Sequence, residues 1–180
     1  PAFENAVESI LHKVGMESAK FKIGFESIPL SACGTEKIDF LFTANEGLTP
    51  RAVEKIASGG EMSRVMLALK GIISRSLALP TIIFDEIDTG VSGKIAEQMA
   101  RLMCEMGKGG RQVISITHLP QIAALGETHY KVRKEDTTSS TISTMQKLNT
   151  EERIKEIAQM LSGSDVSEAA ISNAKELLRL

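Results

Sequence analysis

The stretch Thr81-Ile82-Ile83-Phe84-Asp85-Glu86 decides how this chain of 180 residues is interpreted. A β-branched and aromatic run precedes two acids, which is the pattern of a strand buried on both faces of a parallel sheet. A second such run, 113–117, follows a helical stripe that includes Met99 and Met103. Strand, helix and strand make a right-handed crossover, so the sequence predicts an α/β fold with a parallel core sheet flanked by helices.

The spacing of apolar residues along the rest of the chain predicts further helices and hairpins. The predicted helices cover residues 60–77, 119–125, 154–161 and 170–178, and the predicted hairpins cover 21–44 and 130–145. Residues 45–50 are predicted as a loop. No linker divides residues 16–180, so one undivided lobe is expected there.

Phe3, Val7, Ile10 and Val14 follow a heptad spacing that ends at Gly15. This spacing is typical of the end of a coiled coil, although at least three or four heptads are needed to identify one. An ordinary amphipathic helix is the alternative, and both stay open. Because the chain opens without an initiator Met, we expect it to be a piece of a longer protein.

The composition argues against several classes of protein. Lys and Arg number 21 and Asp and Glu number 23, so the net charge of −2 predicts no polyanion-binding surface from bulk charge. Basic clusters at 131–134 and 108–111 are most simply solvated surface. No apolar run reaches the roughly 18 residues of a membrane span, and the cysteines match no metal-ligand spacing. A cytoplasmic protein with reduced thiols and no membrane partner is expected.

Asp85 and Glu86 lie at the carboxyl end of a predicted strand, where ligands of open α/β sheets bind. Neighbouring side chains of a strand diverge, which suits two different tasks. Asp85 would hold Mg²⁺, directly or through water, and Glu86 would orient a water that attacks a γ-phosphate. The alternative is a solvated polar turn after a buried strand, and this motif alone leaves both interpretations open.

The segment Ser58-Gly59-Gly60-Glu61 stands at the start of the predicted helix over 60–77. One interpretation is a capping box, in which the Ser58 hydroxyl and the Glu61 carboxylate satisfy free backbone N–H groups. The other is a phosphate site, because the glycines leave bare N–H groups at the positive end of the helix dipole and Ser58 adds a donor.

His118 follows the predicted strand over 113–117, so a neighbouring strand would bring it to the edge that carries the acid pair, within range of a phosphate oxygen. Asp88 follows the acid pair closely and either borders the same site or forms a turn. His12 and His129 have no such neighbours and are interpreted as surface residues.

A phosphate-gripping loop is missing from this chain. Such a loop needs Gly-x-x-x-x-Gly-Lys followed by Ser or Thr. The Gly-Lys pairs here lie at 93–94 and 107–108, and neither has the required earlier glycine or the following hydroxyl residue. The chain therefore has candidate catalytic acids without the phosphate grip, and we expect it to form half of an active site.

Together these motifs resemble the ATP-binding-cassette ATPase heads of the SMC, Rad50 and RecN type. The resemblance rests on a signature motif at Ser58, Gly59, Gly60 and Glu61, a Walker B strand ending at Asp85 and Glu86, a D-loop acid at Asp88 and a switch histidine at His118. The runs 84–93, 117–123 and 173–178 resemble the C-terminal lobe of RecN-type heads most closely. The resemblance covers nearly the whole chain.

The resemblance implies a P-loop NTPase fold in which residues 1–15 end a coiled-coil helix and residues 16–180 form the C-terminal lobe of the head. The Walker A lobe of the same protein would be absent from this chain and would be its partner. Two heads would sandwich ATP as a homodimer, with Ser58, Gly59 and Gly60 on the γ-phosphate of the opposing head. Asp85 would assist Mg²⁺, Glu86 would activate water, His118 would sense the γ-phosphate and Asp88 would communicate across the dimer.

The implied function is ATP hydrolysis by an intact RecN-like protein in recombinational repair of DNA double-strand breaks. ATP binding would engage the heads and hydrolysis would release them, whereas this chain alone would be inactive. Glu61 stands where many transporters have Gln, which weakens a transporter interpretation. The alternatives are the head lobe of another SMC-type chromosome-maintenance ATPase and a non-catalytic interaction domain.

Overall fold

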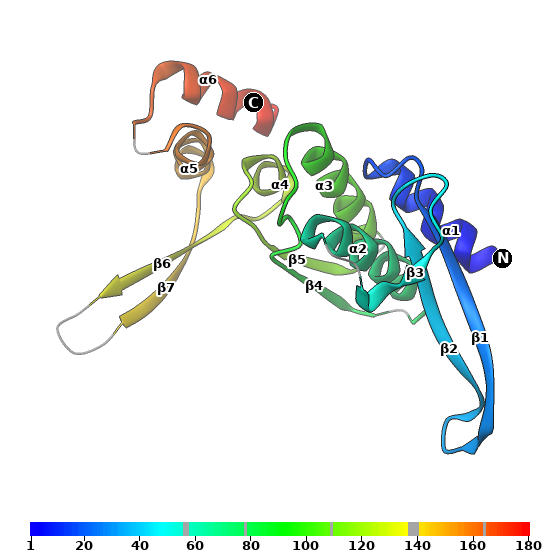
Figure 1. The fold of residues 1–180 in the computed structure, drawn as a ribbon. Helices are drawn as coiled ribbons and strands as arrows, with labels where there is room; N and C mark the ends of the chain where they lie inside the picture. The colour runs from blue at the N-terminus through cyan, green and yellow to red at the C-terminus, as the bar shows by residue number, and fades with distance from the viewer. Residues whose placement is uncertain (56–57, 78, 109, 137–140, 164) are drawn as a thin grey trace. The chain divides into compact units, whose positions relative to one another are not determined.

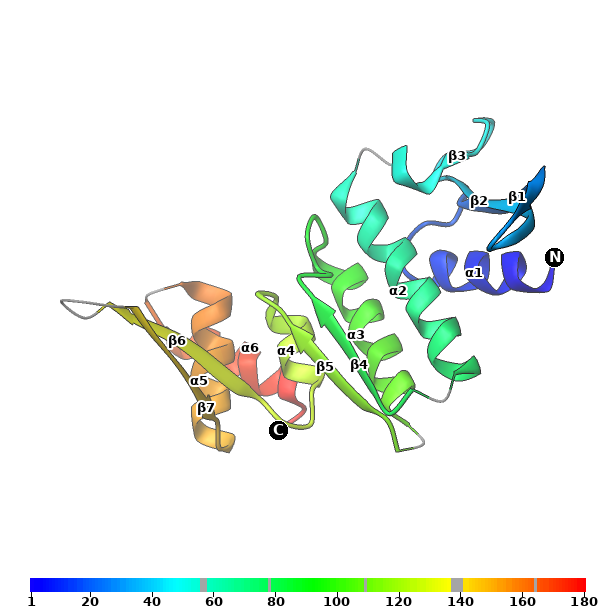
Figure 2. The same ribbon diagram turned by 90° about the horizontal axis from the view of Figure 1, so that it is seen from below.

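The strands β4 (Thr81–Asp85) and β5 (Gln112–Ile116) form the predicted parallel pair. The helix α3 (Gly93–Gly107) connects them, and α2 (Gly59–Ser76) lies on the same side of the strands, as both ribbon views show (Figure 1 and Figure 2). Ile82 and Phe84 are buried. The mixed α/β architecture predicted from the sequence is therefore confirmed.

The computed structural model describes residues 1–55, 58–77, 79–108, 110–136, 141–163 and 165–180. Contacts divide the chain into two compact units, Pro1–Ile116 and Thr117–Leu180. This differs from the undivided lobe predicted over 16–180. The boundary directly follows β5 and no Gly-, Pro- or Ser-rich linker marks it, which is why the sequence pattern did not reveal it.

The prediction that β4 is buried on both faces is wrong. Ile83 is 53% exposed, and its neighbour across the ladder, Ile114, is 39% exposed. Ile116, further along the same face of β5, is 52% exposed. Within the described part of this unit, α2 and α3 pack on the face that carries Phe84. No described element of the unit covers the opposite, apolar face of the two strands.

The strands β1 (Lys20–Ser31) and β2 (Gly34–Thr43) form the hairpin that the sequence predicts over 21–44. The short strand β3 (Arg51–Ala52) adds to β2 and leads into a 3-10 turn, Val53–Lys55; the sequence predicted neither. The helix α1 (Ala2–Lys13) lies along this hairpin (Figure 1).

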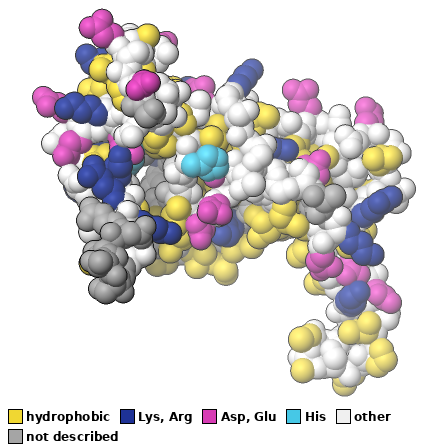
Figure 3. Space-filling view, turned by 60° about the vertical axis from the view of Figure 1, so that its left-hand side comes forward, with side chains coloured by type: hydrophobic (Ala, Val, Ile, Leu, Met, Phe, Trp, Pro, Cys, Tyr) yellow, Lys and Arg dark blue, Asp and Glu magenta, His cyan; other side chains and the backbone are white. Residues whose placement is uncertain are grey.

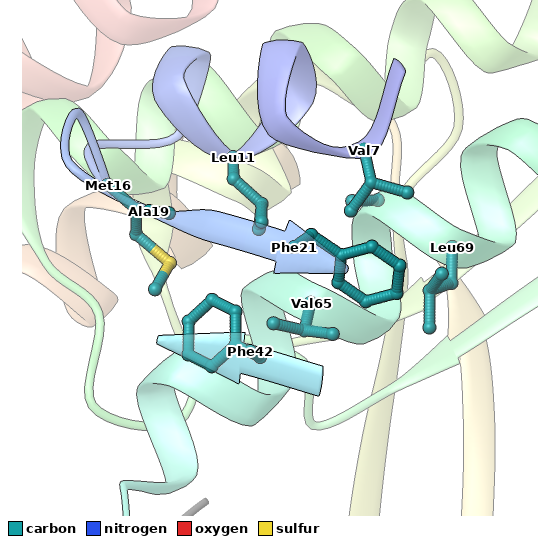
Figure 4. Close-up of a cluster of buried hydrophobic side chains, with 9 residues drawn as sticks. Val7, Leu11, Met16, Ala19, Phe21, Phe42, Val65 and Leu69 are labelled. Carbon is teal, nitrogen blue, oxygen red and sulfur yellow. The ribbon is translucent and has the colours of Figure 1, made fainter. Parts of the chain in front are cut away.

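The core of the first unit lies between α1, the β1–β2 hairpin and α2 (Figure 4). Its buried members are Val7, Leu11, Met16, Ala19, Phe21, Phe42, Val65, Ala68 and Leu69. Phe3 and Ile10 pack against this core, so the heptad-spaced face of α1 serves as the buried face of an amphipathic helix. The assignment of residues 1–15 to a coiled coil stays a prediction.

The carboxylates of α1 also pair with the edge of β1. Glu4 accepts a hydrogen bond from the Ile23 N–H at 2.8 Å, and Glu8 accepts one from the Phe21 N–H at 2.9 Å. Edge-strand donors are thereby satisfied by a helix rather than by another strand.

The second unit contains the helices and the hairpin that the sequence predicts there. They are α4 (Pro120–Leu125), β6 (Tyr130–Asp136), β7 (Thr141–Lys147), α5 (Thr150–Ser162) and α6 (Glu168–Leu178). Small and β-branched side chains form its core, namely Ala124, Ile157, Ala158, Ala170 and Ala174. Among the described helices, none is both long and apolar enough to cross a membrane.

His129 is half-buried, so its interpretation as a surface residue is wrong. Its Nδ1 atom is buried and makes no hydrogen bond to the described residues. Burial lowers the pKa of His129, and the positive charge of Arg153 lowers it further. Lys131, in one of the basic clusters, forms an ion pair with Glu156 and is therefore partly a structural residue.

Phe21 and Phe25 share one face of β1, but Phe21 is fully buried and Phe25 is 64% exposed. We expect Phe21→Ala to lower the free energy of unfolding by about 3–5 kcal/mol, because it removes a large buried ring and leaves a cavity. Phe25→Ala is the matched control and should cost less than about 1 kcal/mol. Urea unfolding measures both, and equal losses would contradict this core.

The pKa of His129 predicts a pH dependence of stability. The folded chain holds His129 neutral, so below the ordinary pKa near 6.5 the unfolded chain binds more protons. Stability should therefore fall as the pH drops through about 6.5 and level off below the lowered folded pKa. His129→Gln should reduce this slope of the urea midpoint against pH, whereas His12→Gln should keep it. An unchanged slope in His129→Gln would refute the assignment.

Candidate functional site

The acid pair lies at the carboxyl end of β4. Asp85 is the last residue of the strand, Glu86 follows it, and both side chains are exposed. The backbone of Glu86 has φ +48°, a left-handed conformation that residues other than glycine rarely adopt. Strain of this kind persists where neighbouring contacts hold it, and it is common at functional sites.

The backbone of Glu86 is held on both sides. Its N–H donates to the Ile116 carbonyl of β5 at 3.3 Å, and its carbonyl accepts a hydrogen bond from Thr89 Oγ1 at 3.0 Å. The Thr89 N–H donates to the same carbonyl at 3.4 Å. The second strand and the following turn therefore both fix the residue that the sequence predicts to activate water.

Asp88 lies in that turn and is fully buried. The Val91 N–H donates to the Asp88 carbonyl at 3.2 Å, which closes the turn. Asp88 therefore does form a turn, as one of the two interpretations predicts, and its side chain is buried rather than solvated. Its role toward a nucleotide stays a prediction.

Ser58 is the N-cap of α2, as predicted, but its side chain makes no capping hydrogen bond. The capping-box interpretation of Ser58 and Glu61 is therefore wrong. A complete capping box does form at α5, where Asn149 and Glu152 have the same spacing. At α2, the Ser58 hydroxyl does not cap the helix. Glu61 instead lines a polar pocket beside Asn45 and Arg64.

Gly60 brings the signature segment against the turn that follows the acid pair. A Cβ atom at Gly60 would lie 3.1 Å from the Gly90 carbonyl oxygen and 3.2 Å from the Thr89 carbonyl oxygen. Gly90 has φ +69°, and a Cβ atom there would lie 3.5 Å from the Gly60 backbone. Glycine is needed on both sides of this contact, so two motifs that are distant in sequence meet at one place.

Lys70 anchors α2 to β4. Its Nζ atom donates to the Ile83 carbonyl at 3.0 Å and lies 5.3 Å from the centre of the Phe84 ring. A cation over an aromatic face is attracted by the ring, so this contact adds to the packing of the helix on the strand. It helps to hold the first turn of α2 close to the Thr89-Gly90 turn.

His118 lies in the second unit, where its side chain is exposed. The Leu119 N–H donates to Thr117 Oγ1 at 3.0 Å beside it, which orders the start of α4. The structure describes this unit separately from the one that holds Glu86. The position of His118 at the edge of the acid pair therefore stays a prediction.

The sequence interpretation missed Arg64, Thr89 and Gly90. Arg64 is half-buried, and its Nη1 atom lies 3.5 Å from the position that a Cβ would take at Gly60. Burial lowers the pKa of Arg64, and the nearby Glu61 opposes that change. The Arg64 Nε atom is buried and makes no hydrogen bond to the described residues. Its position four residues after Gly60, on the same helix face, was a usable signal.

Gly60→Ala and Gly59→Ala test the contact between the two motifs. A Cβ at Gly60 would press on backbone carbonyl groups, so we expect a loss of about 1–2 kcal/mol in the free energy of unfolding. A Cβ at Gly59 would meet only the Thr89 methyl group at 3.7 Å, which is ordinary packing distance. Gly59→Ala should leave stability unchanged or slightly raised. Thermal and urea unfolding measure both variants. If Gly60→Ala and Gly59→Ala changed the free energy of unfolding equally, the contact at Gly60 would not be tight.

Comparisons with known proteins extend this picture. No family model matches the chain. The DNA repair protein RecN of Vibrio cholerae is 38% identical over 177 residues, which cover 97% of this chain and 32% of that protein. The RecN of Rickettsia bellii is 40% identical and has the same coverage of 32%. The RecN of Bacillus subtilis is 40% identical over 154 residues. The chain thus spans about a third of the length of these relatives.

The solved structures that resemble the chain are SMC head domains. One, from a study of ATP-driven dimerization of SMC ATPases, has a TM-score of 0.64 at 21% identity and covers 91% of this chain and 94% of the other. The Smc head from Pyrococcus yayanosii has a TM-score of 0.70 at 21% identity and covers 89% of this chain and 29% of the other. The chain therefore has the fold of an SMC head domain, and nearly its whole length is similar to one segment, about a third, of the DNA repair protein RecN.

Proposed function

We propose that the intact protein is a RecN-like ATPase that acts in recombinational repair of DNA double-strand breaks, and that this chain supplies half of its nucleotide site. The observation that carries the proposal is the contact of Gly60 with the Thr89-Gly90 turn. This contact joins the signature segment to the turn whose Thr89 hydroxyl binds the Glu86 carbonyl, directly after the carboxyl end of β4, where ligands of α/β sheets bind.

The residues of this segment fit an ATP phosphate and a magnesium ion. The first turn of α2 starts with two glycines, its N–H groups carry the positive end of the helix dipole, and capping does not use the Ser58 hydroxyl. Ser58, Gly59 and Gly60 would bind the γ-phosphate held by an opposing head. Glu61 would border this site from the neighbouring pocket.

Asp85 offers an exposed carboxylate for Mg²⁺. Among the described residues, no group of three or more His, Cys, Asp or Glu side chains is placed to hold a metal. A nucleotide magnesium site needs only one or two carboxylates, because phosphate and water oxygens complete the shell. When bound, the ion would neutralise charge that develops on the phosphate oxygens.

Glu86 would take a proton from the attacking water. Its carboxylate is exposed and its backbone is fixed by Ile116 and Thr89, so the side chain starts from a defined position. His118 would contact the γ-phosphate, and Asp88 would communicate with the second head.

A second lobe with the phosphate-gripping loop would complete the site. The outer face of β4 and β5 exposes Ile83, Ile114 and Ile116, and such apolar faces mark interaction surfaces. The far end of the β1–β2 hairpin also keeps hydrophobic side chains at the surface (Figure 3), and Leu30, close to the turn, is 84% exposed. We assign the β4–β5 face to the Walker A lobe of the same protein.

The second head would be another copy of the same protein, with ATP between them. One of the SMC ATPase structures that resemble this chain comes from work on ATP-driven dimerization, which supports this arrangement by analogy. DNA would be bound by the intact protein in the cytoplasm. RecN relatives at 36–40% identity, compared with 21% for the SMC heads, favour a RecN-like task over that of another SMC-type ATPase.

Glu86→Gln in the intact protein tests the proposal. General base catalysis contributes roughly 10² to 10⁴ in rate, so we expect the rate of ATP hydrolysis to fall by at least about 100-fold while ATP binding persists. ATP should then hold the heads together as a long-lived dimer, which sedimentation with and without ATP measures.

Glu105→Gln on the exposed surface of α3 is the matched control and should hydrolyse ATP normally. Rapid turnover by Glu86→Gln would remove Glu86 from the mechanism. An intact protein with no Mg-ATP dependence at all would favour the non-catalytic interaction domain.

A further inference from the structure

We propose that Thr89 is a positioning residue, which holds the backbone of Glu86 and links it to the signature turn of the same head. The proposal rests on the ATPase function proposed above, which it deepens. Two contacts made by Thr89 support it. The Thr89 hydroxyl donates to the Glu86 carbonyl at 3.0 Å, and the Thr89 carbonyl lies 3.2 Å from the position of a Cβ at Gly60.

Glu86 needs such support because its backbone is in a sparsely populated conformation. At φ +48° it is, with Arg179 at the end of α6, one of two residues other than glycine with positive φ in the described chain. Conformations of this kind cost of order 1 kcal/mol or more and persist where the surroundings hold them. The Ile116 carbonyl holds the N–H side of Glu86, and Thr89 holds the carbonyl side.

The side chain of Thr89 also faces the signature segment. A Cβ at Gly59 would lie 3.7 Å from the Thr89 methyl group, so this methyl packs beside the first turn of α2 while the hydroxyl binds Glu86. If phosphate binding moved the first turn of α2, that turn would therefore push on Thr89. Through the hydrogen bond, Thr89 would change the direction of the Glu86 carboxylate.

The hydroxyl holds the Glu86 backbone, whereas the methyl group packs beside the signature segment. Thr89→Val keeps the branched shape but lacks the donor, and Thr89→Ser keeps the donor but lacks the methyl. Thr81→Val is the matched control, because Thr81 is an exposed threonine at the start of β4 whose hydroxyl binds the Gln112 side chain instead.

The first readout is amide hydrogen exchange of this chain without nucleotide. We expect Thr89→Val to speed exchange at the Glu86 and Thr89 amides by about fivefold to tenfold, the effect of losing one hydrogen bond. Thr89→Ser and Thr81→Val should exchange at these amides as the parent does. If Thr89→Val does not fold, Thr89→Ala carries the same test.

The second readout is ATP hydrolysis by the intact protein. Thr89→Val should lower kcat by about fivefold to tenfold with KM changed less than about twofold, and Thr89→Ser should restore most of kcat. Unchanged exchange and kcat in Thr89→Val, or an equal loss in Thr89→Ser, would overturn the inference. Glu86→Gln separates the two claims: if it hydrolyses ATP normally, the proposed function fails; if it is inactive while Thr89→Val is normal, only this inference fails.

Discussion

The close approach of Gly60 to the Thr89-Gly90 turn is the constraint on which the candidate site depends. Carbonyl oxygens of the turn lie 3.1 and 3.2 Å from the position of a Cβ at Gly60, closer than ordinary packing, so glycine lets the helix α2 and the loop after β4 meet without displacement. Lys70, further along α2, secures the same helix to β4 through the Ile83 carbonyl and the Phe84 ring. With the helix fixed in this way, its first turn, the buried Asp88 and the strained Glu86 form one connected segment.

The sheet supports the proposal that this segment forms only part of a nucleotide site. β4 and β5 have the composition of strands with two buried faces, yet Ile83 and Ile116 remain half-exposed in the structure. Apolar surface of this kind gains stability when it is covered, at about 25 cal/mol for each Å². The chain spans about a third of the length of its RecN relatives. We propose that the covering part is the Walker A lobe, which would also bring the phosphate-gripping loop.

Much of the fold could be predicted from the sequence, because helical and strand spacing depends on burial within each element. α2, α3, β4 and β5 lie where the periodicity of apolar residues predicts them. The exposed face of β4 and the division after Ile116 could not be predicted, since both depend on which elements pack together. At the site, the motif residues Asp85 and Glu86 were predictable from their place after a strand. The role of Thr89 was not, because it depends on a backbone conformation at Glu86 and on a contact with Gly60.

If this chain carries half of a nucleotide site, it needs a second lobe to bind ATP. The most direct test is a calorimetric titration of Mg-ATP into the chain alone and into the chain mixed with the Walker A lobe of the same protein. We predict no detectable binding to the chain alone and saturable binding after the lobe is added, because the phosphate grip is supplied by that lobe. Tight, stoichiometric binding of Mg-ATP to the chain alone would contradict the half-site, since it would require a complete nucleotide site within these 180 residues.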